Sequence, residues 1–122
     1  MTLTKRSSKG SALTYTEMDD NLTHLDLYNS VQNISGPGAI SVTTGVTFIT
    51  TTGTDAYTLA DGVEGQFKII IMKAHGGNGT VTPTNLVGYT AVRFTGVNNN
   101  VQLLYGSTGW NIIALQQATR VS

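Results

Sequence analysis

The sequence predicts a mainly β protein, in which a short N-terminal arm and helix precede a small antiparallel β-sandwich or prism-like domain. Three observations favour this class. The 122 residues include 20 threonines, 14 glycines and 9 asparagines, which suit pleated strands and the tight turns between them. Apolar and polar residues alternate over many short segments after residue 38. Turn residues separate these segments every 8–12 residues or so, as in all-β domains.

The N-terminal leader is predicted to span residues 1–37. Residues 1–13 are polar and lack periodicity, so we expect an extended arm that a neighbour must order. A helix is expected over 14–32, because Thr14 and Glu17 match a capping box. One apolar stripe follows three- to four-residue spacing: Tyr15, Met18, Leu22, Leu25 and Tyr28. Such a short helix is marginal alone in water, so it should pack on the β domain or on copies of itself. The breaker NISGPG, at 33–38, ends it.

Seven or eight short strands are expected in the β domain, residues 38–122. The alternating segments are 39–44, 45–51, 56–60, 66–74, 80–86, 91–96, 101–106 and 110–116. Segment 66–74 is the most apolar and should be the central strand. Phe67, Ile69 and Ile71 would share one of its faces, and Lys68, Ile70 and Met72 the other. Since both faces are largely apolar, both should be covered, one of them by another subunit.

Composition and charge exclude several classes of function. The formal net charge is +0 and the one basic cluster (Lys5, Arg6 and Lys9) is small, which argues against a nucleic-acid partner. The sequence has no cysteine, no long apolar run and no apolar signal segment at its start. Only 11% of residues are charged, against about 25% in an average soluble domain. A surface so poor in charge favours association with copies.

Few residues have the chemistry that catalysis needs. His24 follows Asp20 by four residues on the predicted helix, and His75 precedes the turn 76–79; solvent-exposed positions are the preferred interpretation of both. The carboxylates of the β domain are Asp55, Asp61 and Glu64. Their spacing selects no facing pair such as a glycosidase requires. The GGNG segment at 76–79 lacks the lysine and helix of a phosphate loop and is predicted to be a hairpin turn. We therefore predict no enzyme, catalytic residue, metal ligand or cofactor.

A carbohydrate-binding module for host attachment is the alternative that stays open. Asn99 lies in the run of three asparagines at 98–100, and Tyr105 and Trp110 could stack on a sugar ring. The competing interpretation assigns the asparagines to a turn and Trp110 to the core or to a subunit seam.

Two stretches resemble bacteriophage virion structural proteins. The leader LTKRSSKGSALTYTEMDDNLTHLD resembles an N-terminal motif K-x-x-x-K-G-x-x-L-T-x-x-E-M-D-x-N-hydrophobic. The matching positions are Lys5, Lys9, Gly10, Leu13, Thr14, Glu17, Met18, Asp19, Asn21 and Leu22. Residues 57–114 are similar to a β module of phage tail fibres and head fibres, with its Leu-x-Asp-Gly-x-x-Gly turn, its Gly-Thr-Val-Thr-Pro strand and its terminal tryptophan strand.

The resemblance implies a virion component, usually homotrimeric, that docks through its leader onto major capsid or tail proteins. Because the chain lacks a fibre shaft, we expect a capsid decoration (cement) protein, a small spike or a fibre-base element, assembled in the host cytoplasm. The predicted interface residues are Leu13, Tyr15, Met18, Leu22, Leu25, Tyr28, Phe67 and Trp110.

Overall fold

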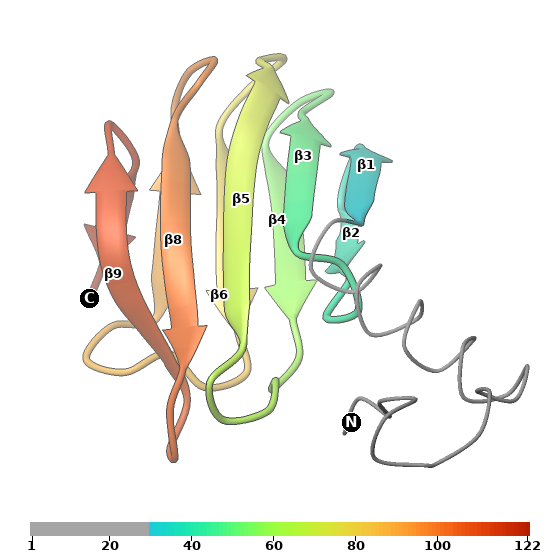
Figure 1. The fold of residues 1–122 in the computed structure, drawn as a ribbon. Helices are drawn as coiled ribbons and strands as arrows, with labels where there is room; N and C mark the ends of the chain where they lie inside the picture. Colours follow the sequence, from blue (N-terminus) through green and yellow to red (C-terminus); the bar gives the residue numbers. More distant parts are fainter. Residues whose placement is uncertain (1–29) are drawn as a thin grey trace, which may run out of the picture.

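Residues 30–122 are described by the computed structural model, and they form two five-stranded β-sheets packed face to face (Figure 1). Sheet A contains, in spatial order, β1 (Val31–Ser35), β3 (Val46–Thr50), β5 (Phe67–Ala74), β8 (Asn100–Tyr105) and β9 (Trp110–Gln116). Sheet B contains β10 (Thr119–Val121), β7 (Ala91–Phe94), β6 (Gly79–Pro83), β4 (Asp55–Leu59) and β2 (Gly38–Ile40). The prediction of a mainly β protein is confirmed.

The chain alternates between the sheets over its first six described strands. Odd-numbered strands enter sheet A and even-numbered strands enter sheet B. Because each strand crosses to the other sheet before the chain returns, successive strands of one sheet run in the same direction: β1, β3 and β5 are parallel, as are β2, β4 and β6. The pairs that involve β7, β8, β9 and β10 are antiparallel. The predicted all-antiparallel pairing is therefore wrong for half of each sheet.

Strand β5 is the central strand of sheet A, as predicted. Its alternation is also as predicted, since Lys68, Ile70 and Met72 are buried between the sheets, whereas Phe67 is 55% exposed and Ile69 and Ile71 are partly exposed on the outer side. This period-2 pattern is readable from sequence because successive side chains of a strand point to opposite faces.

Two strands differ from the sequence-based expectation. β1 covers Val31–Ser35 and pairs with β3, so the predicted helix does not extend through residue 32 and NISGPG is not wholly a breaker. Five residues are too few for a clear period, and pairing with β3 decides their conformation. β10 was not predicted. The arm 1–13 and residues 14–29 of the predicted helix lie outside the described residues.

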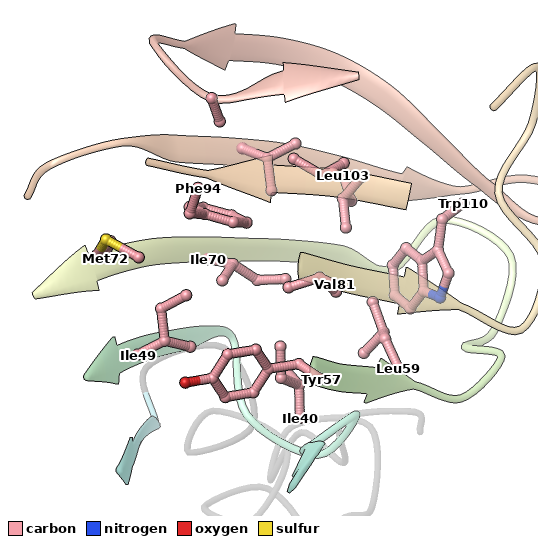
Figure 2. Packing of buried hydrophobic residues seen from close by; sticks show 13 residues of the cluster. Ile40, Ile49, Tyr57, Leu59, Ile70, Met72, Val81, Phe94, Leu103 and Trp110 are labelled. Atoms are coloured by element: carbon pink, nitrogen blue, oxygen red, sulfur yellow. The ribbon is translucent and has the colours of Figure 1, made fainter. Parts of the chain in front are cut away.

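The core lies in one layer between the sheets (Figure 2). Ile49, Ile70 and Met72 of sheet A meet Tyr57 and Phe94 of sheet B, all with almost no exposed surface. Trp110 closes the end of the layer opposite Met72. Its indole Nε1 donates a hydrogen bond to the Ala60 carbonyl at 3.0 Å, and its ring meets that of Tyr105 edge-on at 5.0 Å. The indole thus fixes the loop that follows β4.

Two arches connect the sheets at one end of the sandwich: residues 51–54 between β3 and β4, and residues 75–78 between β5 and β6. The second holds the GGNG turn, which was predicted to be a hairpin but joins strands of different sheets. Thr51 Oγ1 links the arches, since it donates to the Gly77 carbonyl at 2.7 Å and accepts from the amides of Gly76 and Gly77 at 2.8 and 3.2 Å. A Cβ at Gly77 would collide with the Gly53 carbonyl, so the close stacking needs glycine there.

Candidate functional site

The two outer faces of the sandwich have opposite character. Seven apolar side chains, all exposed or partly exposed, point outward from the four neighbouring strands β1, β3, β5 and β8 of sheet A: Val31, Val46, Phe48, Phe67, Ile69, Ile71 and Leu104. We call this set the apolar face. The outward residues of sheet B are mostly small or polar: Ala39, Ala56, Thr58, Thr80, Thr82, Arg93 and Thr119, with the partly exposed Val121 as the apolar exception. A continuous set of partly exposed apolar side chains on one face of a sheet is typical of an interaction surface.

A pocket of about 440 Å³ opens at one end of the apolar face. Its walls are the loop 41–45, which connects β2 to β3, and the loop 60–66, which connects β4 to β5. Apolar side chains make up much of its lining: Val42, Val46, Val63, Phe67 and Ile69. Three of these also belong to the apolar face, so pocket and face form one continuous surface. The volume lies within the range of ligand pockets, which is roughly 300–1,000 Å³.

Gln66 holds the two walls of the pocket together. Its side-chain Nε2 donates to the Val42 carbonyl at 2.6 Å, and its Oε1 accepts from the Val63 amide at 3.0 Å. The backbone N–H of Gln66 also donates to the Val63 carbonyl at 3.0 Å and closes a tight turn. The pocket is therefore fixed by hydrogen bonds across its base.

Lys68 binds loop 41–45 to strand β5. Its Nζ donates to the Thr44 carbonyl at 2.9 Å and to Thr44 Oγ1 at 2.7 Å, while the side chain is fully buried. Burial lowers the pKa of Lys68 to about 8, because a charged amine is disfavoured away from water. The alternation of β5 predicted that Lys68 shares a face with Ile70 and Met72, but nothing in the sequence pointed to its bond with loop 41–45.

Negative charge gathers at the pocket. Among residues 30–122 the exposed carboxylates are Asp61 and Glu64, and both line it. Both oxygens of Asp61 accept from Asn85 Nδ2 at 2.9 Å, so this carboxylate is held in place. Asp55 is buried at the start of β4 and accepts from the Thr52 amide at 2.8 Å. Asp61 and Glu64 therefore lie at the pocket, whereas Asp55 stabilises the arch 51–54.

The described chain begins beside the pocket. Ser30 Oγ donates to the Thr43 carbonyl at 3.3 Å, and the Ser30 carbonyl accepts from the amides of Gly45 and Val46 at 3.1 and 3.3 Å. Thr43, Gly45 and Val46 all line the pocket. Ser30 is therefore fixed at the pocket wall.

The predicted site residues divide into three groups. Phe67 lies on the apolar face and in the pocket. Trp110 is 0% exposed, so its prediction as an interface residue is corrected: the indole is already enclosed within one chain and has no surface left for a partner. The remaining interface residues lie outside the described residues: Leu13, Tyr15, Met18, Leu22, Leu25 and Tyr28.

The predicted sugar contacts are not brought together. Asn99 is 4% exposed, and its Oδ1 accepts from the Thr95 amide and hydroxyl at 2.9 and 3.2 Å. Asn99 directly precedes β8, Tyr105 ends this strand, and Trp110 is buried. The three residues therefore share no surface on which a sugar could lie.

Other candidate sites are limited in the described part of the chain. His75 is exposed just after β5, as predicted, and His24 lies outside the described residues. Residues 30–122 contain no group of three or more metal-ligating side chains. No helix long and apolar enough to cross a membrane occurs among them.

Comparison with known proteins assigns no relative. A scan against models of known protein families finds no match, and a search of curated proteins finds no similar sequence.

Proposed function

We propose that this chain is a non-enzymatic structural subunit of a bacteriophage virion, which assembles with copies of itself through the apolar face and docks through its leader. The observation that carries the assembly is the contrast between the two outer faces. The threonine-rich face of sheet B is suited to water, whereas the apolar face of sheet A leaves valine, isoleucine and phenylalanine side chains exposed or partly exposed. A homotrimer is the state that the resemblance to virion proteins implies.

The energetics of the apolar face support association. Fully burying one such side chain contributes about 1.5–3 kcal/mol, and those of this face are already partly covered, so each adds roughly 1 kcal/mol on further burial. Association costs about 4–15 kcal/mol in lost freedom of motion. When two copies bury their apolar faces against each other, the summed free energy of burial is comparable to this cost. Burial of the whole face is therefore needed, which favours a partner of matching shape, such as another copy.

The leader supports the role in a virion. Its match to the phage motif runs from Lys5 to Leu22. A capsid decoration protein, a small spike or a fibre-base element would use such a segment to dock onto major capsid or tail proteins. Work of this kind is mechanical and requires no catalytic residues.

Light scattering after size exclusion tests the assembly. The full chain is expected to elute at about three times its mass of 12.9 kDa. Ile71→Lys places a charge on the apolar face, next to Phe48, and is expected to give monomers. Thr58→Lys is the matched control, because it adds the same charge to the exposed face of sheet B and should leave the oligomer intact. A wild-type chain that elutes as a monomer at micromolar concentration contradicts the proposed self-association.

Docking onto a particle needs a separate test. An antibody against the β domain, applied to purified phage particles that carry this gene, is expected to label one structure of the virion in electron micrographs. Deletion of residues 1–13 should abolish this label while the oligomer persists. Unchanged labelling after the deletion would locate the docking surface in the β domain.

A further inference from the structure

The pocket between loops 41–45 and 60–66 combines two kinds of chemistry. Val63 is 71% exposed and Phe67 is 55% exposed, so large apolar side chains face solvent there. Asp61 and Glu64 add two carboxylates to the same lining. Lys68, the nearest cation by sequence, is buried beneath loop 41–45 and bonded to Thr44. An occupant that fits this surface carries apolar side chains with positive charges close beside them.

One segment of this chain has that composition. The arm, residues 1–13, contains Lys5, Arg6 and Lys9 beside Leu3 and Leu13, and it has no acidic residue. In an extended arm, residues two apart point to the same side, so Leu3 and Lys5 could enter the pocket and meet a carboxylate together. Opposite charges at such a partly desolvated contact also fix its register.

The rest of the leader is a poorer fit, although it is closer in sequence. Residues 14–29 contain no lysine or arginine and hold four acidic residues: Glu17, Asp19, Asp20 and Asp26. Their charges would repel Asp61 and Glu64. Electrostatics therefore selects the arm over the segment next to it.

The attachment point of the leader brings the arm within reach. Ser30 is hydrogen-bonded to Thr43 and Gly45 in the pocket wall. An extended residue spans about 3.3 Å, so the intervening residues 14–29 can cover up to about 50 Å. A tether of this length keeps the arm at an effective concentration in the millimolar range near the pocket.

We infer that the pocket between loops 41–45 and 60–66 binds the basic arm, residues 1–13, of this protein. An apolar side chain of the arm fills the space between Val42, Val63 and Phe67, and its basic residues face Asp61 and Glu64. The inference goes beyond the proposed function, since it requires no virion and holds whether the arm comes from the same copy or from a neighbour.

Photo-crosslinking of the full chain tests the inference. Benzoylphenylalanine in place of the exposed Val63 is expected to crosslink to residues 1–13, as mapped by peptide mass spectrometry. The same group in place of Thr58, on the outer face of sheet B, should give no crosslink to the arm. The mass of the crosslinked species shows which copy supplies the arm. Crosslinks from position 63 to residues 14–29 alone, or no crosslink to the leader at all, would overturn the assignment.

Proteolysis provides an independent readout that does not depend on the crosslinker. Trypsin should cleave after Lys5, Arg6 and Lys9 about fivefold faster in Glu64→Gln than in the native chain, the change expected for one lost exposed ion pair. Lys73→Gln, which removes an exposed charge elsewhere on β5, should leave the rate unchanged. Equal rates in all three proteins would contradict the role of Glu64. The oligomer mass from light scattering should be the same throughout, so this result is separate from that of the proposed assembly.

Discussion

Two ionisable side chains of the sandwich interior have pKa values shifted by burial. Burial lowers the pKa of Lys68 to about 8. Desolvation raises the pKa of Tyr57, and the charge of Asp55 adds to that effect. The Tyr57 hydroxyl also lacks a hydrogen-bond partner within the described structure. In both residues burial favours the neutral form. As the pH rises, the folded chain therefore loses the Lys68 proton at a lower pH, and the Tyr57 proton at a higher pH, than the unfolded chain does.

The free energy of unfolding should rise as the pH increases from 8 to 9.5. Below about pH 8 the Lys68 amine is charged in both states, and its burial opposes folding. Above that pH the folded chain releases the proton, while the unfolded chain holds it up to about 10.5. Because the unfolded state then binds more protons, stability increases with pH. The expected gain is on the order of 1–2 kcal/mol, measured by urea unfolding at each pH.

Lys68→Met removes this titration and keeps a side chain of similar length. The variant should show no rise over the same range, and its stability at pH 7 should equal or exceed that of the native chain. Tyr57→Phe is the control, because a tyrosine with a raised pKa stays neutral in this window, so the rise should persist. An unchanged pH slope in Lys68→Met would mean that another group is responsible.

At the scale of the elements, the stacked arches 51–54 and 75–78 are the most sensitive feature. Gly77→Ala should lower the free energy of unfolding by more than about 2 kcal/mol, because the new methyl group would collide with the backbone of Gly53. Gly53→Ala is the matched control, since no atom lies within 4 Å of the Cβ that it would add. Denaturant unfolding of both variants checks this, and equal losses would contradict the stacking.

The sequence predicted the elements better than their connections. The high apolar content of residues 66–74 identified the central strand, and the alternation along it separated its two faces, because a side-chain period of two is a local signal. The crossing of the chain between sheets depends on contacts such as Thr51 with Gly77, which lie far apart in sequence and leave no period. The pocket was missed for the same reason. Its walls are two irregular loops, and Gln66 joins them across 24 residues.

At the scale of the whole molecule, the fold of this charge-poor chain places partly exposed apolar side chains together on the outer face of sheet A. The sequence predicted that a partner covers one face of β5. The structure leaves Phe67 of this strand and Val31 of β1 more than half exposed on the outer side of sheet A, and a partner there stays a prediction. Trp110 shows the limit of such inference, because a large aromatic residue suits a core and an interface equally well. The structure buries it beside residues far away in the sequence, such as Ala60, which is 50 positions earlier.

A subunit that hides its apolar face against copies should become more stable as its concentration rises. Unfolding of an oligomer releases separate chains, so mass action shifts the melting temperature upward with total protein. For a domain of this size the shift is expected to be on the order of 5 °C for each tenfold increase in concentration, measured by differential scanning fluorimetry. Ile71→Lys should melt at one temperature throughout, whereas Thr58→Lys should follow the native chain. Deletion of residues 1–13 should keep the dependence, because the apolar face, and not the arm, would hold the copies together. Loss of the dependence on deletion would instead make the arm in its pocket the link between neighbouring copies.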